Sequence, residues 1–234
     1  MNSGFAELRR RLRAAASAED ARILRRFFKT GPGEYGEGDL FLGVRVPALR
    51  RLVPETDALP HPDVLRLLRS RFHEERLLAL LILARRFQRR GPAEQSRVIR
   101  SYLRHMRYIN NWDLVDLSAP HIVGVWLLKR QRGLLDRLAA SPRLWERRIA
   151  VVATLALIRQ GQLADTLRLC ARLLGDEEDL IHKACGWMLR EAGKRDEAAL
   201  EDFLRQHASR MPRTMLRYAI ERFPEPRRLA WLRM

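Results

Sequence analysis

The sequence predicts an all-α protein in which short helices pair as hairpins and stack into an α-solenoid. Apolar residues recur with the helical period over most of the chain, and alternation of the strand type is absent. Glycine or proline interrupts the helical pattern at regular intervals, which predicts tight loops between the helices.

The helical stretches follow one another along the chain. Broad apolar faces predict helices over 76–90 (RLLALLILARRFQRR), 146–160 (ERRIAVVATLALIRQ) and 163–175 (LADTLRLCARLLG). The segment 31–43 (GPGEYGEGDLFLG) is rich in glycine and acidic residues, so it cannot form a stable helix. It also lacks the GK[ST] ending of a phosphate-binding loop, so nucleotide binding is not expected there.

A helix with a polar first turn and a solid apolar run recurs through the sequence. Its copies begin near Arg45, Arg76, Trp112, Arg147, His182 and Arg213. The four central copies are offset by 36, 35 and 35 residues, and each terminal copy lies 31 residues from its neighbour. This spacing predicts about six stacked hairpins, and no linker is long enough to divide residues 1–234 into more than a single domain. The second helices of such hairpins line a concave face, where solenoids usually bind their partners.

The net charge is the strongest compositional signal. The 234 residues include 45 Lys and Arg against 28 Asp and Glu, which gives a formal net charge of +17. Such an excess favours a polyanionic partner, and nucleic acid is a commoner one than a membrane surface. A GC-rich genome would explain the preference for Arg over Lys, but not the excess of base over acid.

Other features of the composition exclude several classes of protein. No apolar run reaches the roughly 18 residues of a membrane-spanning helix, and the acidic residues near the N-terminus do not suit a secretory signal. Cys170 and Cys185 lack metal-ligand spacing, so we expect them in the core of a cytoplasmic protein. The six histidines also lack such spacing, so we expect no metal site. No Ser-His-Asp or Cys-His arrangement for nucleophilic catalysis can be read from the sequence.

One stretch of this basic chain, NNWDLVDLSAP (110–120), contains no basic residue at all. Asn110 or Asn111 can cap a helix here, and Asp113 in the first turn favours the helix dipole, which is enough to explain Asp113. Asp116 gains little from the dipole and lies at i+4 from Trp112, on the same helix face. Trp112 and Asp116 are therefore candidate site residues.

The repeat places further candidates on neighbouring inner helices. Trp112, Arg148 and Lys183 occupy equivalent helix starts, so they are expected side by side on the concave face. Lys183, Trp187 and Arg190 form one stripe at i, i+4 and i+7. The alternative for Arg148 is a solvated first turn instead of phosphate contact.

Core packing is the usual alternative for a tryptophan. It suits Trp126, Trp145 and Trp231 better than Trp112 or Trp187. Trp187 follows Gly186, and a glycine inside a helix costs about 1 kcal/mol, so we expect a close approach at that position.

These residues stand in motifs that resemble, nearly from end to end, the AlkD-type DNA alkylation repair proteins, which are HEAT-like-repeat alkylpurine DNA glycosylases. The motifs are GPGEYGEGDLFLGVRVPALRRL, NNWDLVDLSAPHIVG, LWERRIAVVATLALI, LIHKACGWMLREAGKRD and MPRTMLRYAIERF. The resemblance implies a right-handed α-solenoid of HEAT-like hairpins with a concave, basic, DNA-binding face. It also implies excision of N3- and N7-alkylated purines from double-stranded DNA, with no metal or cofactor and without swinging the base into a pocket.

The resemblance implies residue roles as well. Trp112 and Asp116 match an aromatic–carboxylate pair that faces the deoxyribose of the lesion, and Trp187 matches a second indole in the cleft. The expected DNA-binding residues are Arg148, Arg190, Lys183, Arg45 and Arg50. Arg45 stands where a glutamine occurs in active members, and Phe27 where a tyrosine can occur. Both departures bear on lesion range and rate more than on reaction class.

The chemistry of the residues agrees with this expectation. An N-alkylated purine already carries positive charge, so it leaves without a strong general acid. The sugar becomes an oxocarbenium-like cation as the bond breaks, and a carboxylate between indole faces stabilises that charge. Asp116 can also orient the attacking water. A basic residue within 110–120 would oppose the developing charge.

The sequence therefore predicts a monofunctional, monomeric alkylpurine DNA glycosylase in the bacterial cytoplasm, associated with the nucleoid. One alternative is a non-catalytic HEAT-repeat protein that binds distorted or branched DNA. Another is a protein-interaction scaffold whose charge reflects only genome composition. Salt-dependent affinity for duplex DNA separates the scaffold from the two DNA-binding hypotheses.

Overall fold

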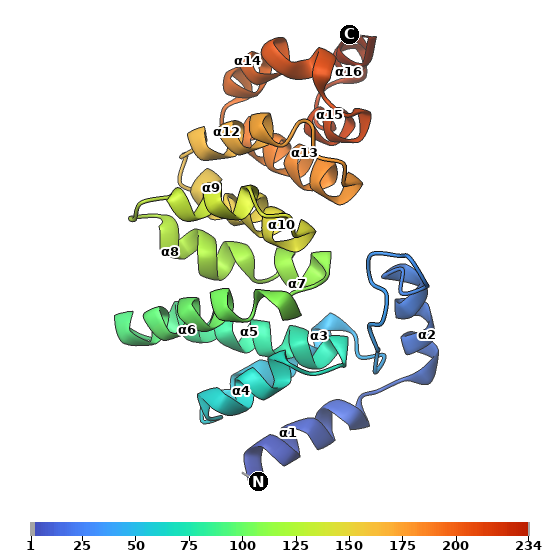
Figure 1. Cartoon of the computed structure of the whole chain (residues 1–234), viewed down its shortest axis with the longest axis vertical. Helices are drawn as coiled ribbons and strands as arrows, with labels where there is room; N and C mark the ends of the chain where they lie inside the picture. Colours follow the sequence, from blue (N-terminus) through green and yellow to red (C-terminus); the bar gives the residue numbers. More distant parts are fainter. Residues whose placement is uncertain (1–2, 234) are drawn as a thin grey trace. The chain divides into compact units, whose positions relative to one another are not determined.

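Short helices joined by tight turns make up the chain (Figure 1). The computed structural model describes residues 3–233, and this range contains no β-strand, only one isolated bridge between Leu40 and Phe72. The all-α prediction is confirmed, and the succession of packed helices is consistent with an α-solenoid. Contacts group the chain into two compact units, one ending at Ser118 and the other beginning at Ala119. That residues 1–234 act as a single domain stays a prediction.

In the first unit, α5 (His73–Arg89) is the central helix. Its apolar run is buried almost completely, and α3 (Val46–Leu52), α4 (His61–Leu68) and α6 (Pro92–Arg104) pack against it. The other helical elements of this unit are α1 (Ser3–Ala14), α2 (Ala18–Phe27), η1 (Val53–Thr56), η2 (Met106–Tyr108) and α7 (Trp112–Asp116).

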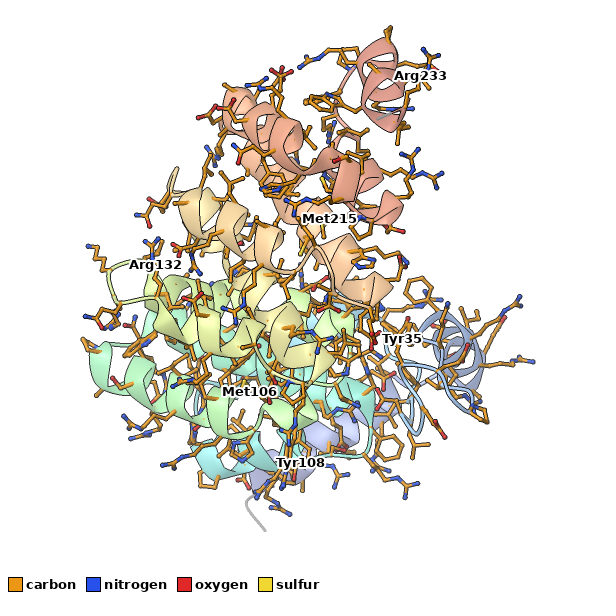
Figure 2. The ribbon with its side chains drawn as sticks, turned by 45° about the horizontal axis from the view of Figure 1, so that its top comes forward. Tyr35, Met106, Tyr108, Arg132, Met215 and Arg233 are labelled. Atoms are coloured by element: carbon orange, nitrogen blue, oxygen red, sulfur yellow. The ribbon has the colours of Figure 1, made fainter. Side chains whose placement is uncertain are left out.

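In the second unit, α13 (Asp179–Gly193) packs against α10 (Leu144–Ala153), α12 (Ala164–Arg172), α14 (Glu197–His207) and α15 (Arg213–Ala219). The other elements are η3 (Pro120–Gly124), α8 (Val125–Leu127), α9 (Gly133–Ala139), α11 (Leu155–Ile158), η4 (Ala208–Arg210) and α16 (Glu225–Arg233). A Cβ on Gly186 would lie 2.6 Å from the carbonyl oxygen of Met215, a residue labelled in Figure 2. The close approach expected at Gly186 is therefore that of α15.

One of the three predicted helix ranges is broken, and the helix predicted to begin near Trp112 is short. The predicted helix 146–160 is broken into α10 and α11 at the buried Thr154, whose hydroxyl donates to the carbonyl of Val151 at 2.6 Å. The helix that begins at Trp112 ends at Asp116, since Pro120 has no N–H to donate to the carbonyl of Asp116. Predicted helices 76–90 and 163–175 correspond to α5 and α12.

The segment 31–43 is irregular, as predicted, and packs tightly at two of its glycines. Gly43 has φ +83°, and a Cβ there would lie 1.9 Å from the carbonyl oxygen of Ser17. A Cβ on Gly36 would lie 2.4 Å from the carbonyl oxygen of Phe28. These contacts join the segment to α2.

The structure also bears on the predictions for the two cysteines and for membrane-spanning helices. Cys170 and Cys185 are buried, as expected, and burial raises the pKa of the Cys170 thiol. Between residues 3 and 233, no helix has the length and the apolar character that crossing a membrane requires.

Candidate functional site

The short helix α7 carries Trp112 and Asp116, the two candidates selected from the acidic stretch. Asn111 caps it, because its side-chain oxygen accepts from the backbone N–H of Trp112 at 2.8 Å, as the sequence predicted. Leu114 and Val115 are fully buried, whereas Trp112 and Asp116 are half-buried. The helix is thus anchored by its apolar residues and keeps the indole and the carboxylate at the surface of the first unit.

Trp112 packs against three phenylalanine rings, and we call Trp112, Phe27, Phe28 and Phe41 together the aromatic column. The Trp112 ring stacks on Phe28 with 5.2 Å between ring centroids, and Phe28 stacks on Phe41 at 5.3 Å. Phe27 meets the edge of Trp112 at 5.8 Å and is 59% exposed, unusual for a phenylalanine. The indole N–H of Trp112 donates to the hydroxyl of Tyr35 at 3.3 Å. Tyr35 lies on the loop that follows α2 (Figure 2). Ring contacts and this hydrogen bond fix the plane of the indole.

These rings form the wall of a pocket of about 420 Å³ within the first unit. The pocket is mostly apolar, and Asp116 contributes a carboxylate to it. It is lined by Leu24, Phe27, Phe28, Phe41, Val44, Arg45, Val46, Pro47, His73, Glu74, Leu77, Trp112, Asp113, Asp116 and Leu117. An apolar pocket with a few converging polar groups is the usual form of a ligand site.

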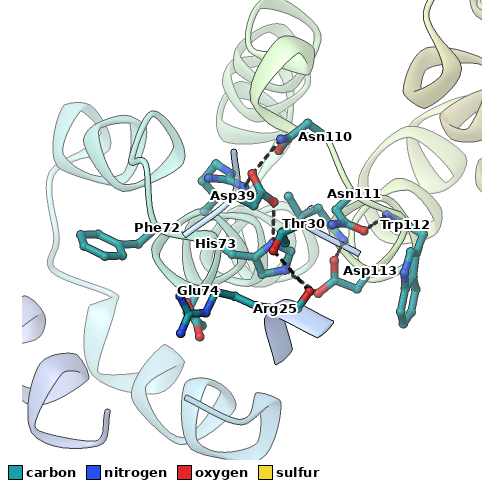
Figure 3. A network of polar contacts seen from close by, with 12 residues as sticks. Arg25, Thr30, Asp39, Phe72, His73, Glu74, Asn110, Asn111, Trp112 and Asp113 are labelled. Carbon is teal, nitrogen blue, oxygen red and sulfur yellow. Dashed lines mark hydrogen bonds and ion pairs between the residues drawn. The ribbon is translucent and has the colours of Figure 1, made fainter. Parts of the chain in front are cut away.

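Beneath the pocket lies a buried network centred on His73, at the first position of α5 (Figure 3). The imidazole Nδ1 is 3.2 Å from Oδ2 of Asp39, and Nε2 is 2.8 Å from Oδ2 of Asp113. Arg76 and Asn110 both donate to Oδ1 of Asp39, at 2.8 and 3.0 Å. The network joins the segment 31–43, α5 and the first turn of α7.

The charges in this network decide the protonation of His73. Burial opposes a charged imidazole, but Asp113 and Asp39 outweigh it and raise the pKa of His73 to about 9. Burial likewise opposes the ionised form of Asp39, yet hydrogen bonding from His73 and the charge of Arg76 hold the pKa of Asp39 below its ordinary value. At neutral pH His73 is thus an imidazolium that donates to a carboxylate from each nitrogen.

The next residue of α5, Glu74, holds the other side of the pocket. Its buried carboxylate accepts the backbone N–H groups of Leu42, Gly43 and Val44 at 2.9, 2.8 and 3.2 Å. A carboxylate that accepts three backbone N–H bonds fixes that backbone firmly. The first turn of α5 therefore fastens two walls of the pocket, through His73 and Glu74.

One arginine, Arg45, lines the pocket, and further basic side chains are exposed elsewhere on α2 and α3. Arg45 donates to Oδ1 of Asp20 on α2 at 2.5 Å, a contact that lowers the pKa of Asp20. The helix α2 supplies Leu24 and Phe27 to the pocket, and Arg22, Arg25, Arg26 and Lys29 in and just after it are exposed. Arg50 on α3 is exposed as well.

The remaining candidates belong to the second unit. Trp187 is half-buried and lines a hollow with Leu155, Ile158, Arg159, Glu191, Lys194 and Arg195. Arg148 is buried, at 5% exposure, and donates to the carbonyl of Leu180 at 2.5 Å. Lys183 pairs with Asp179 at 2.8 Å, and Arg190 pairs with Glu221. Internal contacts thus engage all three cationic candidates of this unit, and their role toward DNA stays a prediction.

The sequence pattern points to Trp112 and Asp116 but not to four residues that support them. No local pattern distinguishes Asp39, His73 or Glu74, and helix chemistry alone explains an aspartate at position 113. All four are buried. Within residues 3–233, no group of His, Cys, Asp and Glu side chains is placed to hold a metal ion.

Comparison with known proteins identifies the family. The family model described as DNA alkylation repair enzyme matches residues 8–223. The chain belongs to the DNA alkylation repair family. A solved structure, titled as a predicted DNA alkylation repair enzyme from Enterococcus faecalis, has a TM-score of 0.68 to this family member. The two are 18% identical, over 90% of this chain and 97% of the other, and at that identity the likeness shows the fold. No curated protein matches the sequence.

Membership of the DNA alkylation repair family gives the pocket a chemical setting. The family description supports a role in DNA repair and DNA as the substrate. Asp116, Trp112 and the phenylalanine rings lie in one pocket of this family member, and their role as site residues stays a prediction.

Proposed function

We propose that the protein is a monofunctional DNA glycosylase that hydrolyses the N-glycosidic bond of N3- and N7-alkylated purines in double-stranded DNA. The observation that carries the proposal is the meeting of Asp116, Trp112 and Phe27 at a single pocket in a member of the DNA alkylation repair family. A carboxylate among aromatic rings suits a reaction that develops positive charge.

The reaction needs little from the protein beyond the negative charge of a carboxylate and the electron-rich faces of aromatic rings. The bond between C1′ and the purine nitrogen breaks, and its electron pair leaves with the base, which becomes neutral. The deoxyribose is left as an oxocarbenium-like cation, and Asp116 and the face of Trp112 stabilise it. A water oxygen then bonds to C1′, and its proton passes to Asp116 or to solvent. No metal or cofactor takes part.

Binding of the duplex is supported by the charge around the pocket. Arg45 lines the pocket, where it can reach a phosphate next to a lesion held against Trp112. The exposed basic residues of α2 add positive charge to the same unit. From the resemblance we assign backbone contacts to Arg50, Arg148, Lys183 and Arg190, and a place beside the sugar to Trp187. The protein acts as a monomer in the cytoplasm.

The test is a base-release assay. Purified protein is incubated with duplex DNA containing 7-methylguanine, and the free base is measured by chromatography. The proposal expects free 7-methylguanine and an abasic site in equal amounts, because the enzyme cleaves only the glycosidic bond. An adduct that stays in the DNA after prolonged incubation with excess enzyme would refute it.

Arg45 favours a second candidate function, a protein that binds distorted or branched DNA without excision. A cation at the pocket rim opposes the charge of the transition state, and Arg45 is such a cation. This alternative expects tight binding to four-way junctions and no free base. The same preparation, assayed for junction binding and for base release, separates the two.

A further inference from the structure

The polar network beneath the pocket connects segments that are far apart in the sequence. Asp39 precedes His73 by 34 residues and Asp113 follows it by 40. Each imidazole nitrogen faces one of the two carboxylates, so His73 bridges the segment 31–43 and α7 directly (Figure 3). The side chain of His73 is 2% exposed, which keeps water from competing for these hydrogen bonds.

The same imidazole touches the aromatic column. Its ring stacks on Phe41 with 4.6 Å between centroids and lies 4.9 Å from Phe28. Phe28 in turn stacks on Trp112. His73 therefore reaches Trp112 by two routes, one through the rings and one through Asp113, the neighbour of Trp112 in the chain.

The helix that carries Trp112 and Asp116, α7, is too short to be stable without contacts to the rest of the protein. α7 has five residues, and a helix that short is unstable in isolation. Besides its buried apolar residues, Asn111 caps it and Asp113 ties its first turn to α5. The orientation of Asp116, one turn later, follows from that of Asp113.

We infer that His73 is a positioning residue of the proposed active site, which sets Trp112 and Asp116 by clamping Asp113 of α7 and Asp39 of the segment 31–43. The inference rests on the proposed function for its effect on rate. It also assigns a purpose to the acidic, glycine-rich segment, which is to bring Asp39 to His73 and Tyr35 to the indole N–H.

Stability alone is a poor reason for this network. Two carboxylates, an imidazolium and a guanidinium are expensive to bury, and well-packed apolar residues are often as stable or more so. What a fully paired network adds is one fixed geometry. A displacement of about 1 Å in a catalytic group can lower a rate by about 100-fold, so a fixed geometry has a large effect on catalysis.

The experiment follows the indole N–H resonance of Trp112 and the base-release kinetics in the same variants. The resonance is assigned in the full-length protein by its absence from Trp112→Phe. The variants are His73→Gln and Asp113→Asn, the second of which keeps the shape of the side chain. His61→Gln is the matched control, because His61 is half-buried in the same unit and bonded to Ser101, and it does not line the pocket.

Positioning predicts a shifted Trp112 resonance in both variants, and a base-release rate about 10- to 100-fold lower at an unchanged half-saturating DNA concentration. The control should alter neither. An unmoved Trp112 resonance in folded His73→Gln or Asp113→Asn overturns the inference, whatever the rate. If His73→Gln does not fold, the Trp112 resonance and the base-release rate of Asp113→Asn decide whether the inference holds. Absence of base release from the wild type would overturn the proposed function, and the resonance would still decide whether His73 positions Trp112.

Discussion

Nε2 of His73 lies 2.8 Å from Oδ2 of Asp113, the buried residue that follows Trp112 in α7. This contact makes the first turn of α5 the support of the candidate site, because α7 alone is too short to be rigid. Two neighbouring residues of α5 share the task, since His73 holds α7 and Glu74 holds residues 42–44.

The protonation of His73 predicts how stability depends on pH. Its pKa is about 9 in the folded protein against an ordinary value near 6.5, so the folded state binds the proton more tightly. Asp113 and Asp39 face the imidazole, and Arg76 lies beside them. The stabilisation is fully present below pH 6.5 and is lost as pH rises through 9, by about 3 kcal/mol at most.

Urea unfolding between pH 6 and pH 10 measures this loss. The free energy of unfolding should fall more steeply with pH in the wild type than in His73→Gln. His61→Gln should follow the wild type, because burial lowers the pKa of His61, so this histidine does not share the upward shift of His73. Parallel curves for the wild type and His73→Gln would contradict a charged His73.

Arg45→Gln should raise the rate of base release a few-fold. Arg45 lines the pocket and its ion-pair partner Asp20 does not, so the nearer positive charge opposes a cationic transition state. Arg51→Gln is the control, because Arg51 on α3 is exposed, as Arg45 is, but does not line the pocket. Both variants should lose similar DNA affinity in a binding titration, and only the first should gain rate. A lower rate in Arg45→Gln would show that Arg45 assists the reaction.

Gly43→Ala should destabilise the protein and loosen the pocket wall. Gly43 has φ +83°, and a Cβ there would lie 1.9 Å from the carbonyl oxygen of Ser17. Gly38→Ala separates the two causes, because Gly38 has φ +82° and no atom within 4 Å of the added Cβ. Gly38→Ala should cost about 1 kcal/mol from backbone strain alone, and Gly43→Ala clearly more. Thermal unfolding compares them, and equal losses would show that the contact with Ser17 relaxes freely.

Gly186→Ala should also destabilise the protein, although alanine is a better helix former than glycine by about 1 kcal/mol. The added Cβ would lie 2.6 Å from the carbonyl oxygen of Met215, so α13 and α15 would have to separate. Gly4→Ala in α1 is the control, since nothing lies within 4 Å of its Cβ and the substitution should stabilise. A more stable Gly186→Ala would mean that α15 adjusts without cost.

Local patterns in the sequence predicted much of the fold. Helical periodicity located α5 and α12. The i, i+4 spacing put Trp112 and Asp116 on one helix face, and both residues line one pocket, while their role as site residues stays a prediction. The break at Thr154 was missed, because the apolar pattern continues across it while a side-chain hydrogen bond interrupts the helix.

The support of the site could not be predicted, because its partners are distant in sequence. His73 stands in the ordinary polar first turn of a helix, and nothing local distinguishes it from the other five histidines. Only the packing of the segment 31–43 and α7 against α5 brings Asp39 and Asp113 to its two nitrogens. Arg148 shows the same limit, since its burial against Leu180 follows from the packing of α13.

The most direct test of the role proposed for the Asp116 carboxylate is the single-turnover release of 7-methylguanine by Asp116→Asn. Asparagine keeps the shape of the side chain and removes the charge, so DNA affinity should stay within about twofold while the rate falls by about 100-fold or more. Asp202→Asn, an exposed acid on α14, is the control and should release base at the wild-type rate. An Asp116→Asn enzyme that releases 7-methylguanine as fast as the wild type would contradict the central claim.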